Sequence, residues 1–119
     1  MRIKRKPLDD LFSKYIRLKA ENRCERCGNY SKKLDCSHFW GRGRLNVRHD
    51  EENASALCCG CHKYLGSNAE EHRAFFLKRL GQERYDLLQI RANTRWDGDE
   101  EALKLYFRKK ISELKEGEE

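Results

Sequence analysis

The stretch Asn53-Ala-Ser-Ala-Leu-Cys58-Cys-Gly-Cys61-His62 contains a pair of cysteines, Cys58 and Cys61, that are separated by two residues. An earlier stretch, Cys24-Glu-Arg-Cys27-Gly28, has the same spacing. Two such pairs are typical of a tetrahedral zinc site with four thiolate ligands. We therefore predict a structural zinc ion that joins the two stretches and closes the chain between them into a loop. Its expected ligands are Cys24, Cys27, Cys58 and Cys61.

The other two cysteines leave alternatives open. Cys59 could replace its neighbour Cys58 as a ligand, and we expect Cys36 to be a small buried hydrophobic residue. A free-thiol or redox role is the alternative to zinc for the paired cysteines. Without a secretory signal pattern, metal ligands and free thiols are more typical of such a chain than disulfides.

The composition favours one small, polar domain. The 119 residues are 38% hydrophobic and 39% charged, so the core is small and benefits from a metal crosslink. The net charge of +6, with its positive excess in residues 1–68, favours a polyanionic partner. No apolar run is long enough to span a membrane, and we expect a soluble, cytoplasmic protein without membrane contact.

Apolar spacing and turn residues predict an α+β fold that is mostly helical. We expect a single domain over 1–119, with a basic tail at 1–7, a zinc-held ββα core at 24–66 and a helical part at 69–119. The expected strands are 34–40 and 45–48, followed by a turn at 50–53. The expected helices are 8–21, 59–65, 69–80, 82–91 and a last one capped by Asp97 or Asp99.

Three polar residues in and beside the zinc-closed loop could carry out phosphodiester hydrolysis. This reaction needs a base for the attacking water and positive charge at the phosphate. His38 is the candidate base, because the pKa of imidazole lies near neutrality. His62 is the candidate ligand of a catalytic divalent ion. Asn53 could ligate that ion through its carbonyl oxygen or hold the loop by hydrogen bonds.

The string from Asn53 to His62 resembles the HNH endonucleases, which have a ββα-metal fold. Within that family the chain is most similar to the phage NinG (Rap) recombination nucleases. This likeness covers most of the chain and includes Phe12-Ser-Lys-Tyr-Ile-Arg-Leu-Lys19, Asp50-Glu-Glu-Asn53, Tyr64-Leu-Gly-Ser-Asn68 and Leu80-Gly-Gln-Glu-Arg84. The resemblance implies that His38 is the general base, that the four cysteines hold zinc, and that a metal-bound active site lies near His62 and Asn53.

The chain departs from the HNH pattern in two places. Many HNH enzymes have an acidic metal ligand directly before the base, where this chain has Ser37, and Asp35 could replace it. On a regular strand Asp35 would lie on the face opposite His38. NinG-like relatives also often lack a histidine at the position of His62.

The expected activity is metal-dependent DNA endonuclease cleavage, with Mg²⁺ or Mn²⁺ as catalytic ion and zinc as structural ion. The substrate would be double-stranded or branched DNA, and partners could include phage recombination or packaging proteins. Arg42, Arg44 and Arg48 flank the candidate site and could contact phosphates. The alternatives are a non-catalytic zinc-containing nucleic-acid-binding module and a zinc-stabilised protein-interaction domain.

Each site residue also has an ordinary structural interpretation. His38 could be a plain strand histidine, and Asn53 a turn residue or helix cap. His62 could replace a cysteine at the zinc or lie on a helix surface. We expect His49 and His72 to be surface residues, and Phe39 and Trp40 to pack in the core or hairpin.

Overall fold

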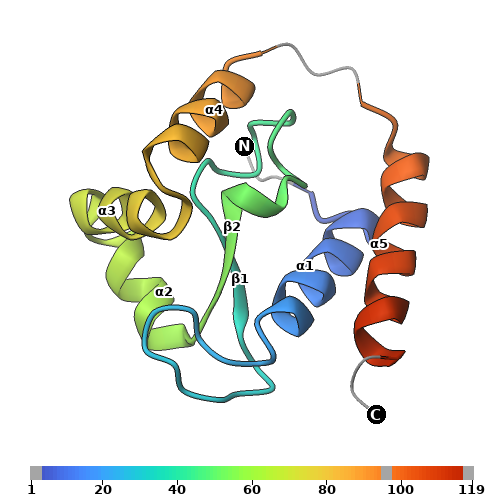
Figure 1. Cartoon of the computed structure of the whole chain (residues 1–119), viewed down its shortest axis with the longest axis horizontal. Coiled ribbons are helices and arrows are strands. Elements are labelled where there is room, and N and C mark those ends of the chain that lie inside the picture. Colours follow the sequence, from blue (N-terminus) through green and yellow to red (C-terminus); the bar gives the residue numbers. More distant parts are fainter. Residues whose placement is uncertain (1–3, 95–97, 117–119) are drawn as a thin grey trace.

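The computed structural model describes residues 4–94 and 98–116 of the chain. Within these ranges the fold is α+β and mostly helical, as predicted (Figure 1). The described elements are α1 (Pro7–Lys19), β1 (Asp35–His38), the 3₁₀ turn η1 (Glu51–Asn53), β2 (Ala54–Leu57), α2 (Cys59–Gly66), α3 (Ala69–Leu80), α4 (Gln82–Ala92) and α5 (Glu100–Glu116). None of the described helices combines the length and apolar character needed to cross a membrane.

Helix positions follow the sequence pattern closely. The prediction of 69–80 is confirmed by α3. The predicted bounds of the helices that correspond to α1, α2 and α4 differ from the observed ones by one or two residues, and the last predicted helix, given only by its cap, corresponds to α5. Asp99 caps α5, since its carboxylate accepts hydrogen bonds from the backbone N–H groups of Glu101 and Ala102 at 3.0 and 3.3 Å. The other candidate cap, Asp97, lies outside the described residues.

The two strands form an antiparallel pair in which Asp35 faces Leu57 and His38 faces Ala54. The prediction of a second strand at 45–48 is wrong, because those residues form turns and the partner of β1 is β2. The four residues of β2 are all buried. The strand therefore lacks the alternation of buried and exposed residues by which a half-buried strand is recognised in a sequence. Val47, a residue of the wrongly predicted strand, is buried under α3 and α4.

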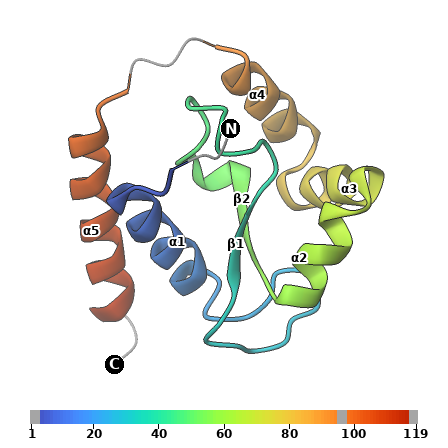
Figure 2. The ribbon, with the colours of Figure 1, turned by 180° about the vertical axis from the view of Figure 1, so that it is seen from behind.

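One core lies between α1, α5 and the strands. Leu8, Phe12, Tyr15 and Ile16 form the buried face of α1, at the spacing expected of an amphipathic helix. The ring of Phe107 on α5 lies 5.2 Å from that of Phe12 and 5.4 Å from that of Tyr15. The two helices lie side by side in both ribbon views (Figures 1 and 2).

A second core lies under α3 and α4. It contains Val47 together with Phe76, Leu80, Leu88 and Ala92, and Phe39 and Trp40 pack against it. The packing role predicted for Phe39 and Trp40 is therefore confirmed. The prediction that His72 lies on the surface is wrong, since its half-buried ring lies 5.3 Å from that of Phe39.

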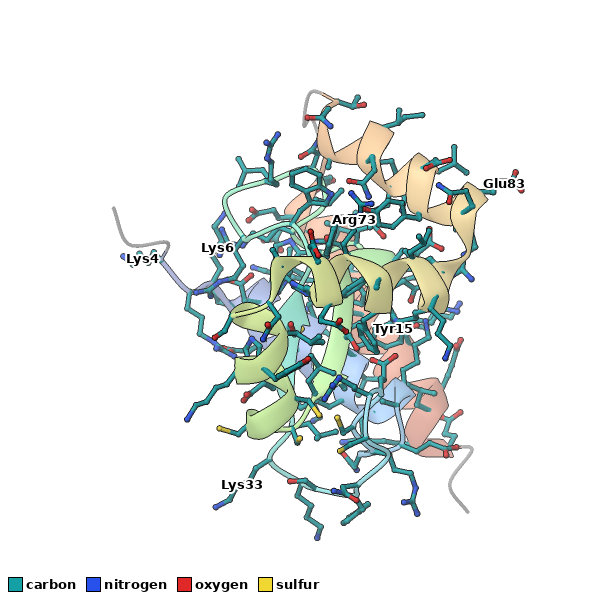
Figure 3. All side chains as sticks on the ribbon, turned by 90° about the vertical axis from the view of Figure 1, so that its left-hand side faces the viewer. Lys4, Lys6, Tyr15, Lys33, Arg73 and Glu83 are labelled. Atoms are coloured by element: carbon teal, nitrogen blue, oxygen red, sulfur yellow. The ribbon has the colours of Figure 1, made fainter. Side chains whose placement is uncertain are left out.

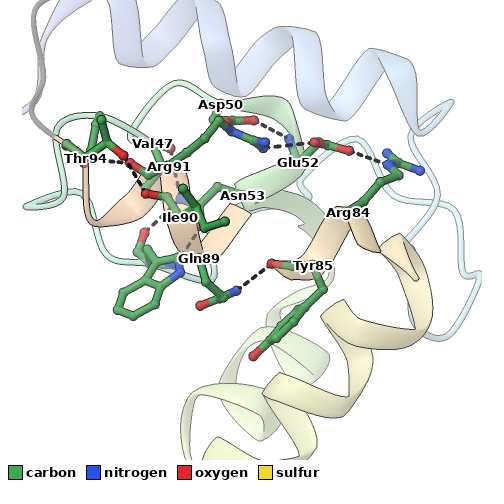
Figure 4. A network of polar contacts seen from close by, with 12 residues as sticks. Val47, Asp50, Glu52, Asn53, Arg84, Tyr85, Gln89, Ile90, Arg91 and Thr94 are labelled. Carbon is green, nitrogen blue, oxygen red and sulfur yellow. Dashed lines mark hydrogen bonds and ion pairs between the residues drawn. The ribbon is translucent and has the colours of Figure 1, made fainter. Parts of the chain in front are cut away.

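Helix α4 fixes η1 through ion pairs (Figure 4). Arg91 donates to Asp50 at 2.7 Å and to Glu52 at 2.9 Å, and Arg84 also pairs with Glu52. These contacts hold the backbone of η1 just before Asn53, at the entry to β2. The second core and these ion pairs together set the position of the loop between the strands.

A buried ionic cluster joins α1 to the same loop. Asp9 accepts two hydrogen bonds from Arg48, at 3.0 and 2.5 Å, and lies 2.7 Å from Nε2 of His49. All three residues are buried, so the prediction of a surface His49 is wrong. Burial alone would raise the pKa of Asp9, but hydrogen bonds from Arg48, the Lys6 backbone and His49 hold that pKa well below its usual range. Asp9 is therefore a buried carboxylate that stays charged.

We expect Arg48→Met to destabilise the protein by about 3–5 kcal/mol, because it leaves the buried Asp9 charge without its main partner. Lys110→Ala is the matched control, since it removes one half of an exposed pair with Glu113 and should cost less than about 1 kcal/mol. Urea unfolding of both variants measures the difference. Equal losses would contradict a structural role for the Asp9–Arg48 pair.

Candidate functional site

The four paired cysteines meet in space. The Sγ atoms of Cys24, Cys27, Cys58 and Cys61 all lie within 4.8 Å of one another. A tetrahedral zinc ion with Zn–S bonds of about 2.3 Å needs sulfur atoms roughly 3.8 Å apart. The Sγ atoms of Cys27 and Cys58 lie 3.8 Å apart, so the donor set and its spacing could hold a metal such as zinc. Figure 3 shows sulfur atoms gathered beside the start of α2.

Backbone contacts help to orient the thiols within each of the two cysteine pairs. The backbone N–H groups of Cys27 and Cys61 point at the sulfur atoms of Cys24 and Cys58, at 3.5 and 3.4 Å. Gly28 follows the first pair with φ of +80°, a conformation that favours glycine. Among the described cysteines, Cys59 and Cys36 lie outside the cluster, so Cys58 and not Cys59 belongs to it.

A cleft of about 640 Å³ lies between α1, β1 and the start of the loop that follows it. His38 and Asp35 line it from β1, and His62 lines it from α2. The two histidines that sequence reasoning selected therefore share one cleft. Three arginines also line it, namely Arg5, Arg17 and Arg42.

The contacts of His38 define which of its nitrogens is available as a base. Its Nε2 lies 2.9 Å from the backbone carbonyl oxygen of Arg48. A carbonyl only accepts hydrogen bonds, so Nε2 carries the proton and Nδ1 of the neutral ring keeps its lone pair. Burial lowers the pKa of His38, and the Arg48 carbonyl only partly opposes this shift. The ring is therefore a neutral base at neutral pH.

His62 and Asp35 form a pair at the rim of the cleft. Nδ1 of His62 lies 3.0 Å from a carboxylate oxygen of Asp35, and both side chains are more than 40% exposed. An imidazole beside a carboxylate is a suitable donor pair for a hard divalent cation. Asp35 and His38 both line the cleft, although they are three residues apart on the regular strand β1. Cys36 lines it too, but burial raises the pKa of its thiol to about 12 and keeps it protonated.

Asn53 holds the loop by hydrogen bonds, which is the second of the two roles predicted for it. It is fully buried, its Oδ1 accepts from the backbone N–H of Trp40 at 2.8 Å, and its Nδ2 donates to the carbonyls of Trp40 and Val47 (Figure 4). These three hydrogen bonds hold the loop between the strands, and Asn53 does not line the cleft. Its side chain supports the site and has no geometry for direct metal binding.

The three arginines predicted to contact DNA have different environments. Arg42 lines the cleft. The guanidinium of Arg44 lies 4.8 Å from the centre of the Trp40 ring and donates to Asn93, outside the cleft lining. Arg48 is 3% exposed and bound to Asp9, so it is not available for a phosphate.

Sequence reasoning missed the contribution of α1 to the cleft. Asp9, Ser13 and Arg17 all line it, and Arg5 lies just before the helix. The signal was present, because residues four apart lie on one face of a helix. The apolar face of α1 packs in the core, and its polar face forms a wall of the cleft.

For the cysteine cluster, we expect Cys58→Ala to lose bound zinc and to unfold at lower denaturant concentration, because one of four ligands is gone. Cys59→Ala should keep zinc, since Cys59 is exposed and outside the cluster. Metal analysis of the purified variants, with chelator-treated wild type for reference, measures both effects. Loss of zinc from Cys59→Ala alone would overturn the ligand assignment.

Comparison with known proteins identifies the family. The family model described as Bacteriophage Lambda NinG protein matches residues 4–118. Two curated relatives called Protein ninG, from Escherichia phage 933W and Enterobacteria phage VT2-Sa, are each 28% identical over 96 residues, which cover 77% of this chain and 48% of each relative. The chain thus spans about half the length of these relatives, and no solved structure matches it. Because the family model covers nearly the whole chain, the chain belongs to the phage NinG family.

Proposed function

We propose that this protein is a metal-dependent DNA endonuclease of the HNH type, with β1, β2 and α2 as its ββα-metal core. The observation that carries the proposal is the cleft shared by His38 and His62. A strand carries the proposed base, a buried asparagine holds the connecting loop, and a helix that begins at the cysteine cluster carries the second histidine. This order of parts matches the order that the HNH resemblance implies.

In the proposed reaction, Nδ1 of His38 takes a proton from a water molecule, and the resulting hydroxide attacks phosphorus. The Arg48 carbonyl keeps the ring in the tautomer that this step needs. His62 and Asp35 are the residues that would hold a divalent ion, which supplies positive charge at the phosphate and the leaving 3′ oxygen when bound. The products would carry 5′-phosphate and 3′-hydroxyl ends.

The finer details of the activity come from the sequence resemblance. Double-stranded or branched DNA as substrate, Mg²⁺ or Mn²⁺ as catalytic ion, and phage recombination or packaging proteins as partners remain predictions. The alternative, a zinc-containing module that binds DNA without cutting it, gives no role to the lone pair of His38 or to the His62–Asp35 pair.

We expect His38→Ala to slow cleavage of supercoiled plasmid by about 10²–10⁴-fold in Mg²⁺ or Mn²⁺, the range typical of a lost general base. Zinc content and the urea midpoint should remain close to those of wild type. His72→Gln, which changes a histidine outside the cleft, should cut normally. Cleavage by His38→Ala at the wild-type rate would remove His38 from the mechanism, and wild-type protein that retards plasmid without cutting it would favour the binding module.

The pH dependence gives a separate test. Burial lowers the pKa of His38 below the ordinary histidine value, and only the neutral ring can accept a proton. We therefore expect kcat/KM to be level near pH 7 and to fall only below about pH 6.5, as the ring becomes protonated. Zinc content at each pH must be measured in parallel. An acid limb centred above pH 7 that His38→Ala leaves unchanged would contradict this assignment.

A further inference from the structure

We propose that Arg17 of α1 is a phosphate-binding residue, so that the DNA backbone crosses the cleft with α1 as one of its walls. This inference rests on the proposed nuclease function and adds a binding residue to which the sequence analysis assigns no role. Arg17 lines the same cleft as His38 and His62 but comes from a different element. A phosphate bound by Arg17 would be a neighbour of the one that is cut.

The first support is the charge balance of the cleft lining. Asp9 is already engaged by Arg48, His49 and the backbone N–H of Lys6, and Asp35 faces His62. Neither carboxylate pairs with Arg17 or Arg42, and within residues 4–94 and 98–116 no salt bridge engages either arginine. Among the described residues, Arg17 and Arg42 thus line the cleft without a carboxylate partner.

The second support is the way Arg17 is held. Its Nε donates to the backbone carbonyl of Ser13, one turn earlier on α1, at 3.2 Å. This hydrogen bond uses the inner nitrogen of the guanidinium and leaves the two terminal nitrogens for another acceptor. A planar pair of donors suits two oxygens of one phosphate. Arg5 differs from Arg17 because it already pairs with a carboxylate, that of Asp10. Both of those side chains are more than 60% exposed.

The third support is space. A cleft of about 640 Å³ lies within the range of roughly 300–1,000 Å³ usual for ligand sites. It can therefore admit a backbone phosphate beside the His38–His62 pair. Most hydrogen bonds of DNA-binding proteins go to backbone oxygens, and these contacts set the position of the DNA without reading its sequence. Arg17 would position the cut strand and would contribute nothing to sequence preference.

The experiment measures DNA binding separately from cutting. All variants are made in the His38→Ala background, and anisotropy with a labelled 20-base-pair duplex gives Kd over a series of salt concentrations. We expect Arg17→Ala to weaken binding by about tenfold at low salt and to reduce the slope of log K against log salt by about 0.9, the value for one lost phosphate contact. Arg17→Lys should recover part of the affinity, because it restores the charge but not the paired donors.

Arg73→Ala is the matched control, since Arg73 is exposed on α3 and outside the cleft lining. It should leave the Kd and the salt slope unchanged. An unchanged slope in Arg17→Ala, with an unfolding midpoint equal to that of the parent, would overturn the Arg17 proposal and leave the nuclease proposal intact. Undiminished cutting by His38→Ala alone would remove the proposed mechanism, whereas the binding data would still decide the role of Arg17.

Discussion

The charge on Asp9 is the constraint on which the geometry of the cleft depends. This carboxylate belongs to α1, but its partners Arg48 and His49 belong to the loop between the strands. Because the pair is buried, separating α1 from the loop would leave an uncompensated charge in the protein interior. The same Arg48 supplies the carbonyl that orients His38. The side chain of Arg48 therefore fixes the loop to α1, and its backbone carbonyl orients the ring of His38 at the end of β1.

The cysteine cluster sets the other side of the cleft. It joins the turn after α1 to the start of α2, and His62 follows Cys61 directly. His62 thus lies beside Asp35 and directly after the cluster, whereas the ring of His38 contacts Arg48, the partner of Asp9. The cysteine cluster and the Asp9–Arg48 pair each join segments that line this cleft, in a chain whose hydrophobic fraction is only 38%.

Sequence reasoning predicted the parts of this fold that local patterns determine. Cysteine spacing selected the four clustered residues, and apolar periodicity placed α1 to α4 within two residues of their observed ends. It failed where long-range contacts decide. Val47 looked like a strand residue because nothing local showed that α3 and α4 would cover it. Arg48 looked like a DNA contact because its partner, Asp9, lies far away in the sequence.

The candidate site shows the same division. His38 and His62 could be selected from the motif, and Asn53 could be selected but not assigned, because a carboxamide serves equally as a ligand or as a loop support. Arg17 was missed because its role depends on which face of α1 turns toward the strands. That orientation is decided by packing against α5 and not by the helix alone.

The contact between α1 and α5 also has a consequence for biosynthesis. Phe12 and Tyr15 pack against Phe107, so almost the whole described chain lies between the two sides of this contact. A nascent chain leaves the ribosome from its amino end, and contacts so distant in sequence form late. The part of the apolar face of α1 that contacts Phe107 therefore stays open to water, and to chaperones, until α5 has been synthesised.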